Sequence, residues 1–245
     1  MIFMQQPQQI KDMVLGVSEI IDETATVKSF KMELPANSEI NFYPGQFFMV
    51  SFPNDPEIKT ARAYSIASSP QQKKYLEIAL NKVGPFTAKM FELKPGDQLK
   101  FKGPYGKFYF SEEMKNSLVL IGGGVGITPL IGIIRHCTDK KLGNKIKLIY
   151  SVKTADEIIY KNELEGLKAA NQNFDYVVTV TKDEENQNWK GERGRIDIIL
   201  LGENVENAPE NIYFLCGSNE FVHDIIGLLE AIGVKRDQMK TDVWG

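Results

Sequence analysis

Residues 118–129 read LVLIGGGVGITP, and this stretch decides what fold the second half of the chain can adopt. The apolar run 118–121 is typical of a buried strand, and glycines follow it at once. Glycines let a backbone approach a phosphate closely, and the free N–H groups of a helix start bind the anion. Thr128 is a suitable N-cap, and Pro129 suits the first helical position. The stretch predicts a strand, a phosphate-binding turn and a helix, with a tight turn that binds no ligand as the alternative.

Apolar runs and helical patterns alternate through the rest of the chain. We expect strands at 146–150, 174–180 and 211–215, and helices at 128–137, 160–169, 196–201 and 219–232. Such alternation predicts βαβ units and a parallel sheet. The first 110 residues differ, because short runs rich in β-branched and aromatic residues, at 25–32, 46–52 and 75–80, lie between turn signals. Strands at this spacing predict a sandwich or a barrel.

The composition excludes several classes of protein. The 245 residues are 42% hydrophobic and 25% charged, and the net charge is −3, so no strong attraction to nucleic acid or to an anionic membrane is expected. No apolar run reaches the roughly 18 to 20 residues that a membrane span needs. Residues 1–9 do not read as a signal peptide. We expect a soluble, cytoplasmic protein that binds neither nucleic acid nor membrane.

Metal ligands are scarce in the sequence. Its only cysteines are Cys137 and Cys216, too few for the four thiolates of a usual iron–sulfur cluster. The sequence has only two histidines, and this small number disfavours a zinc site. We therefore expect no metal and no intrinsic cluster, so that any redox chemistry comes from an organic cofactor. Cys137 has no motif around it and is expected to fill the core.

Six short motifs follow one another in an order that resembles the ferredoxin–NADP reductase superfamily, over about residues 10 to 245. They are RAYS at 62–65, GPFT at 84–87, KPGD at 94–97, GPYGKF at 103–108, GVGITP at 124–129 and CGSN at 216–219. The resemblance implies an FAD-dependent NAD(P)H oxidoreductase. It implies an antiparallel Greek-key β-barrel that binds FAD at residues 8–113, then an α/β parallel-sheet domain that binds NAD(P) at residues 114–245.

The resemblance implies that the residues of the RAYS motif, Ala63 among them, bind the flavin. Arg62 offers a planar fork of donors for the FAD phosphates. Tyr64 offers a flat face to the isoalloxazine ring and a hydroxyl to the ribityl chain. Ser65 is implied to hydrogen-bond flavin N5, the atom that accepts hydride. A surface arginine beside a core tyrosine is the alternative.

The GPFT motif resembles the segment that binds the FAD diphosphate. Gly84 would allow close approach, Thr87 would donate its hydroxyl, and Pro85 belongs to the same binding segment. Phe86 either covers the adenine or packs against the barrel. A plain hairpin turn is the alternative for this segment, and it would make FMN more plausible than FAD.

The nicotinamide side of the resemblance involves the CGSN motif and the end of the chain. Cys216 and the adjacent Gly217 are implied to contact the nicotinamide, with Cys216 not acting as a nucleophile; a small buried hydrophobic residue is the alternative. Trp244 is similar to an aromatic that stacks on the flavin and moves when nicotinamide enters. Asp242 lies where some members carry an acid that handles protons. A frayed terminus is the alternative for both, and Ser65, Cys216 and Asp242 are the expected catalytic residues.

Three segments are expected to bind the rest of the dinucleotide. Their candidate ligands are Gly124, Gly126, Thr128, Ser151, Lys153, Thr181 and Lys182. Cations and hydroxyls suit the 2′-phosphate of NADPH, whereas a carboxylate suits NADH. Lys153 and Lys182 thus favour NADPH over NADH as the substrate, and Asp183 opposes this preference.

Lysines are concentrated near the end of the first half. Eight of them lie between residues 73 and 107 against three acids, a local balance of 8 − 3 = +5. This balance favours docking of an acidic electron carrier such as ferredoxin or flavodoxin, with a solvated barrel face as the alternative. Two other functions stay open, a reductase component for an oxygenase or for free flavin, and a non-catalytic FAD-binding subunit of a larger redox complex.

Overall fold

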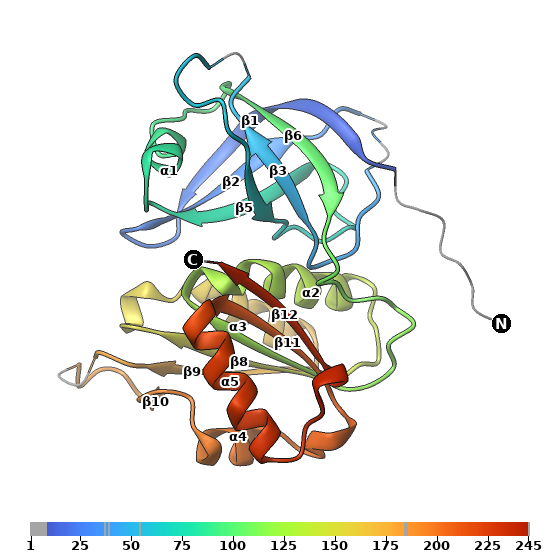
Figure 1. The fold of residues 1–245 in the computed structure, drawn as a ribbon, viewed down its shortest axis with the longest axis vertical. Coiled ribbons are helices and arrows are strands. Elements are labelled where there is room, and N and C mark those ends of the chain that lie inside the picture. The colour runs from blue at the N-terminus through green and yellow to red at the C-terminus, as the bar shows by residue number, and fades with distance from the viewer. Residues whose placement is uncertain (1–8, 37, 39, 54, 184–185, 245) are drawn as a thin grey trace.

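A computed structural model of the chain describes residues 9–36, 38, 40–53, 55–183 and 186–244. Figure 1 shows two bodies in contact, a β-barrel formed by the first half of the chain and a helix-covered sheet formed by the second. Residues 1–8, which include the expected start of the first domain and most of the stretch without signal-peptide features, lie outside the described residues. The position of the boundary at residues 113 and 114 stays a prediction.

The first half forms a six-stranded antiparallel sheet with the order β4-β3-β6-β1-β2-β5, which curls into a barrel (Figure 1). The elements are β1 (Lys11–Asp22), β2 (Val27–Glu33), β3 (Phe47–Ser51), β4 (Arg62–Ser65), β5 (Tyr75–Asn81), α1 (Pro85–Met90) and β6 (Gln98–Tyr105). Phe30, Phe48 and Phe101 are fully buried inside it. The antiparallel barrel is confirmed.

Strand β5 is buried on both faces and thereby joins the two halves of the molecule. Leu76, Ile78 and Leu80 belong to the core inside the barrel, whereas Ala79 packs in a core shared with the second half. Because side chains alternate along a strand, Glu77 points to the same side as Ala79. A carboxylate is therefore buried at the boundary between the two halves.

The second half forms a six-stranded parallel sheet with the order β10-β9-β8-β7-β11-β12. Its strands are β7 (Leu118–Gly123), β8 (Ile146–Val152), β9 (Phe174–Val180), β10 (Glu192–Arg193), β11 (Ile212–Ser218) and β12 (Met239–Trp244). Its helices are α2 (Ile127–Asp139), α3 (Lys161–Ala170), α4 (Ile198–Asn204) and α5 (Asn219–Ala231), with short 3-10 turns at Gly124–Gly126, Ala155–Glu157, Ala208–Glu210 and Arg236–Gln238. The parallel α/β domain is confirmed.

The helices of the second half cover both faces of its sheet. One core lies under α2 and α3, and a second lies under α4 and α5. Cys137 is fully buried in the first of these cores, as expected. Helix α2 also faces the barrel (Figure 1), and a Cβ atom added at Gly132 would lie 2.7 Å from the carbonyl oxygen of Ile66. The two halves therefore touch through backbone as well as side chains.

The start of helix α2 differs from the prediction. The N-cap is Gly126, and Thr128 instead donates its hydroxyl to the carbonyl oxygen of Val125 at 2.7 Å, so Pro129 is the third helical residue and not the first. The reason is tertiary. A Cβ atom at Gly126 would lie 2.3 Å from the carbonyl oxygen of Cys216, so the neighbouring strand β11 fixes where the turn tightens into the helix.

Two segments that the sequence left open are regular structure. Residues 85–90 form helix α1, not the hairpin turn that was the alternative for GPFT. The last described residues form β12, which pairs in parallel with β11, so the end of the chain is an ordered strand up to Trp244. This pairing joins segments that are distant in sequence, and local pattern gives no sign of it.

Candidate functional site

A cavity of about 400 Å³ lies where the barrel meets the α/β half. The barrel lines it with Ala63, Tyr64, Ser65, Ala79, Leu80, Asn81, Val83 and Thr87, and the α/β half with Val125, Thr128, Pro129, Cys216 and Trp244. The strand β4 thus faces the carboxyl ends of β7 and β11. Ligands of open parallel sheets bind at such carboxyl ends.

Many of the predicted site residues line this cavity. Seven predicted residues line it, namely Ala63, Tyr64, Ser65, Thr87, Thr128, Cys216 and Trp244. The sequence missed Asn81 and Val83, which follow the core residues of β5, and no local signal distinguishes them from an ordinary strand end. It also missed Val125 and Pro129 as lining residues, although both stand inside the glycine motif.

The end of the chain approaches the barrel at this cavity. The hydroxyl of Ser65 donates to Oδ2 of Asp242 at 3.4 Å, although the two residues are 177 positions apart. The pairing of β11 with β12 places Asp242 beside Cys216, and Trp244 beside Ser218. The three expected catalytic residues therefore lie around one point on the boundary between the halves.

Burial controls the protonation of this group. Burial raises the pKa of Asp242, and the hydrogen bond from Ser65 acts against the rise. Burial likewise raises the pKa of the Cys216 thiol well above its usual value, and the nearby Asp242 adds to this effect. Cys216 therefore stays a neutral thiol near pH 7, which agrees with contact to a ligand and not with a nucleophile.

Asp242→Asn is expected to increase the free energy of unfolding near pH 7. The carboxyl of Asp242 loses its proton above about pH 4 in the unfolded chain, whereas the folded chain keeps it until the pH reaches the raised pKa. The free energy of unfolding of the wild type therefore falls as the pH rises from the unfolded pKa to the folded pKa. Asparagine removes this fall, and the gain over wild type should grow with pH. Urea unfolding at several pH values measures it, with the exposed Asp156→Asn as the control. A gain independent of pH would contradict the assignment.

The residues that face the cavity from the barrel suit a flat aromatic ligand with a phosphate tail. Tyr64 keeps its proton, because burial raises its pKa to about 12 while the charge of Arg62 acts in the other direction. The Arg62 side chain is exposed, and its one hydrogen bond within the described residues runs to the carbonyl oxygen of its neighbour Ala61. Its remaining donors can turn to a ligand phosphate. These features fit FAD.

The GPFT segment presents the start of helix α1. Thr87 Oγ1 accepts hydrogen bonds from the backbone N–H groups of Val83 at 2.8 Å and Gly84 at 2.9 Å. A Cβ atom at Gly84 would meet no atom within 4 Å, so the backbone there is open to a ligand. Phe86 is only 6% exposed and packs on Phe52 with 4.9 Å between ring centroids, so its packing is shown and its contact with adenine stays a prediction.

The remaining candidate ligands lie along one edge of the parallel sheet. Gly124 and Gly126 follow β7, Ser151 and Lys153 stand at the end of β8, and Thr181 and Lys182 follow β9. The register pairs Gly123 with Ser151 and Val152 with Val180, which places these loops side by side. Asp183 bonds two of them together, because its Oδ2 accepts from the backbone N–H of Ala155 at 3.0 Å.

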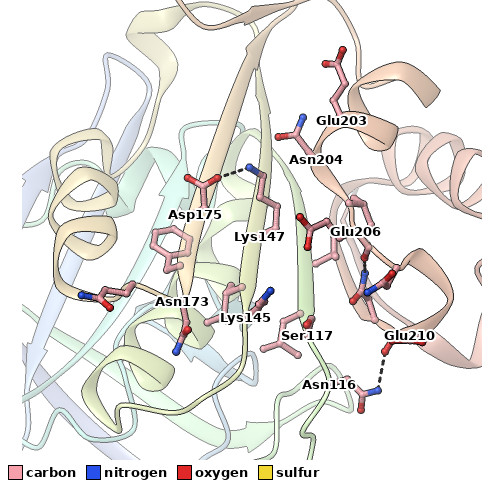
Figure 2. A pocket seen from close by; sticks show the side chains of 18 residues that line it. Asn116, Ser117, Lys145, Lys147, Asn173, Asp175, Glu203, Asn204, Glu206 and Glu210 are labelled. Carbon is pink, nitrogen blue, oxygen red and sulfur yellow. Dashed lines mark hydrogen bonds and ion pairs between the residues drawn. The ribbon is translucent and has the colours of Figure 1, made fainter.

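A different pocket, of about 510 Å³, opens at the opposite edge of the sheet, where the strands begin (Figure 2). None of the predicted ligands lines it, and its Lys147 pairs with Asp175 at 2.6 Å. Its charges are therefore partly engaged with each other. The predicted residues that line a cavity together do so at the boundary between the two halves.

The described part of the chain lacks two kinds of feature. No group of three or more His, Cys, Asp and Glu side chains there is arranged to hold a metal ion. No helix in the same residues is long and apolar enough to cross a membrane.

Comparison with known proteins matches both halves of the chain. The family model of the oxidoreductase FAD-binding domain matches residues 15–110, and that of the oxidoreductase NAD-binding domain matches residues 120–226. The chain is 30% identical to NADH-cytochrome b5 reductase 2 of Scheffersomyces stipitis over 201 residues, which cover 80% of this chain and 67% of the relative.

Two further proteins are similar over nearly the whole chain. A component of the Na(+)-translocating NADH-quinone reductase of Idiomarina loihiensis is 27% identical over 271 residues, which cover 91% of this chain. The chain spans 65% of the length of that component. The ferredoxin reductase in carbazole 1,9a-dioxygenase superposes with a TM-score of 0.83 at 27% identity, covering 96% of this chain and 70% of that structure.

Proposed function

Because the chain belongs to the ferredoxin–NADP reductase superfamily, with an FAD-binding and an NAD-binding domain, we propose that it passes electrons from NADH through FAD to a protein carrier. The observation that carries this proposal is the boundary cavity, where Ser65 of the barrel meets Asp242, Cys216 and Trp244 of the other half. Hydride transfer requires two ligands at close range, and a site between two binding domains provides this.

The barrel residues hold and orient the flavin. Arg62 binds the diphosphate as a charged fork, and the open backbone at Gly84 lets the phosphates approach. Tyr64 lies along the cavity wall with its hydroxyl protonated. Bound FAD supplies an N5 atom that accepts a hydride from the nicotinamide. Ala63, Pro85, Phe86 and Thr87 complete the proposed cofactor site.

The α/β residues place the nicotinamide and handle the proton. Cys216 is buried beside Asp242 and offers a neutral thiol to the nicotinamide. The adjacent Gly217 is proposed to contact the nicotinamide through its backbone, because the ring of Phe221 fills the position where a side chain would lie. Ser65 holds a hydrogen bond to Asp242. Ser65 Oγ can therefore take part in moving a proton between the cavity and the Asp242 carboxyl, whose raised pKa favours the protonated form.

Asp183 supports NADH as the electron donor, whereas the sequence favoured NADPH. Its carboxylate stands between the loops that follow β8 and β9, where the adenosine is proposed to bind. A carboxylate accepts a hydrogen bond from a ribose 2′-hydroxyl and repels a 2′-phosphate. Lys153 and Lys182 are exposed in the same loops and are proposed to contact the dinucleotide together with Ser151 and Thr181. The names of the two curated relatives described above also contain NADH.

Asp183→Asn is expected to shift the preference toward NADPH about fivefold, because it removes a charge that repels the 2′-phosphate while the amide can still accept from Ala155. The measurement is the ratio of kcat/KM for the two dinucleotides with an artificial acceptor. The matched variant Lys153→Ala/Lys182→Ala should shift the ratio the other way. An unchanged ratio in Asp183→Asn would place the adenosine elsewhere.

A third cavity suggests where the carrier docks. It has a volume of about 330 Å³, is lined by Lys107, Lys240 and Phe47, and includes Asp242, which also bonds to Ser65 of the first cavity. Two cations in a cavity that shares Asp242 with the proposed redox site favour an acidic carrier such as ferredoxin or flavodoxin. Within the described residues, two lysines of the +5 stretch are paired, Lys89 with Asp55 and Lys100 with Asp12.

The proposal is tested by anaerobic mixing of the FAD-loaded protein with NADH. Bleaching of the flavin absorbance is expected, and reoxidation by an acidic one-electron carrier should slow at high ionic strength. Flavin that NADH leaves oxidised would favour the non-catalytic FAD-binding subunit. Reoxidation by free flavin or by an oxygenase component, with no response to acidic carriers, would favour a reductase component for an oxygenase or for free flavin.

A further inference from the structure

Arg135 near the end of helix α2 forms a buried set of bonds across the boundary between the two halves. Its Nη1 donates to the carbonyl oxygen of Ala67 at 2.8 Å, and its Nη2 lies 3.2 Å from Oε1 of Glu77; both partners belong to the barrel half. Within its own half, Nε and Nη2 donate to the two carboxylate oxygens of Glu163 at 2.6 and 2.7 Å. One guanidinium thus ties a helix of the α/β half to two segments of the barrel.

Tyr160 completes the cluster on its other side. Its ring lies under the Arg135 guanidinium, with 4.9 Å from the central carbon to the ring centroid. Its hydroxyl is 3.2 Å from Oγ of Ser29, and its backbone N–H donates to Oε2 of Glu23 at 3.2 Å. Ser29 and Glu23 are barrel residues, so Tyr160 also bonds across the boundary. We call Arg135, Tyr160, Glu163 and Glu77 the boundary cluster.

The cluster is built for a fixed geometry. Glu77 is 1% exposed, and a carboxylate at such a place is costly unless it is paired and hydrogen-bonded. Burial tends to lower the pKa of Arg135, but the hydrogen bonds that Arg135 donates to Glu163 and the charge of Glu77 raise the pKa overall, so the arginine stays charged. A planar fork with several donors makes these contacts at once, and a lysine ammonium cannot replace it.

The same helix reaches from the cluster to the redox cavity. Thr128 and Pro129 in its first turn line the cavity, the missing side chain of Gly132 lets it approach the carbonyl of Ile66, and Arg135 binds Ala67. The segment 65–67 begins with Ser65, which lines the cavity from the barrel side. Helix α2 therefore links the two walls of the cavity through Gly132 and Arg135, which lie outside the cavity.

We propose that Arg135 is a positioning residue, which holds the nicotinamide-binding wall of the cavity at the distance from the flavin-binding wall that hydride transfer requires. This proposal rests on the proposed function. Reaction between two bound groups depends steeply on their separation and orientation, so a small displacement of one wall slows the hydride step without abolishing binding. The described partners of Arg135 are Ala67, Glu77, Glu163 and Tyr160, and none of them lines the cavity.

The test compares Arg135→Lys, Arg135→Ala and Glu77→Gln with wild type as FAD-loaded full chains. Stopped-flow mixing with saturating NADH should show the rate constant of flavin reduction lowered at least tenfold in both Arg135 variants. The dissociation constant of NAD⁺ should stay within threefold of wild type, and the charge-transfer band should weaken. Glu77→Gln keeps the shape of the side chain and loses its charge, so it reports on the bond across the boundary if Arg135→Ala does not fold.

A second readout does not use the flavin. In the FAD-free chain, hydrogen exchange of the backbone amides of residues 66–69 should be faster in Arg135→Lys than in wild type. The control is Lys147→Ala, which removes the ion pair with Asp175 at the far edge of the same sheet. It is expected to lower thermal stability and to leave both the reduction rate and the exchange of residues 66–69 unchanged.

The outcomes separate the two proposals. Arg135 variants that reduce flavin at the wild-type rate, with wild-type exchange at residues 66–69 and a lowered Tm like that of Lys147→Ala, would reduce Arg135 to a stabilising residue and overturn the inference. Wild-type flavin that NADH does not reduce would instead overturn the proposed function. In that case unchanged hydrogen exchange of residues 66–69 in the FAD-free Arg135 variants would still reject the positioning role of Arg135. Faster exchange would support that role.

Discussion

Arg62→Ala is expected to weaken FAD binding about 100-fold, which corresponds to about 2 to 3 kcal/mol. Arg62 stands on β4 immediately before the cavity residues Ala63 and Tyr64, and its guanidinium is exposed, with one hydrogen bond to the adjacent Ala61 among the described residues. Truncation therefore leaves the fold of the free protein intact and removes only the charge-assisted contacts with the phosphates. The loss should appear in affinity and not in stability.

The measurement is a titration of the FAD-free protein with FAD, followed by quenching of flavin fluorescence. Arg195→Ala is the matched control, because Arg195 is an exposed arginine that pairs at 3.7 Å with Asp224 and lies outside the cavity. The control should bind FAD as wild type does, and Arg62→Lys should fall between the two. Wild-type affinity in Arg62→Ala would show that the phosphates lie elsewhere, and a protein that binds neither FAD nor FMN would refute the flavin assignment altogether.

Trp244→Ala is expected to tighten NAD⁺ binding about 30-fold, or about 2 kcal/mol. The indole lines the boundary cavity beside Cys216, and it is 41% exposed at the end of the edge strand β12. A nicotinamide placed against Cys216 would need the volume that the indole fills, so binding must first displace the ring and give up its packing. Alanine has no ring to displace. Turnover should fall, because a more stable complex releases its product slowly.

The titration uses oxidised wild type and variants with NAD⁺, followed by the charge-transfer band. Trp244→Phe keeps an aromatic ring on the same strand and should bind close to wild type, which separates loss of the ring from loss of the strand end. The preference between NADH and NADPH should stay unchanged in Trp244→Ala, because both carry the same nicotinamide and the indole opposes both equally. An unchanged affinity and band would place Trp244 away from the nicotinamide.

The order of elements was readable because it depends on neighbours in the chain. The apolar run 118–121 before the glycines predicted strand β7, and the alternation after it predicted a parallel sheet of the observed kind. The RAYS and CGSN motifs likewise placed Tyr64, Ser65 and Cys216 at the cavity, because motif residues are adjacent and each stands at a strand end. Periodicity and turn chemistry are properties of a few consecutive residues, so a single sequence contains them.

The start of helix α2 shows where this reasoning fails. Thr128 has the chemistry of an N-cap, yet Gly126 takes that position because the strand β11 leaves no room for a side chain there. The same holds for β12, which exists as a strand because β11 offers it an open edge. Neither contact is visible from the residues around the affected position.

The sequence by itself determined the class of each half, the glycine turn and the short motifs, because these follow from the spacing and chemistry of neighbouring residues. Only the tertiary structure decided that Asp242 reaches Ser65 across 177 positions and that Arg135 meets Glu77 across 58. Both contacts cross the boundary between the halves. Their partners come together through the packing of helix α2 and strand β12 against the barrel, and packing depends on surfaces formed by residues far apart in the chain.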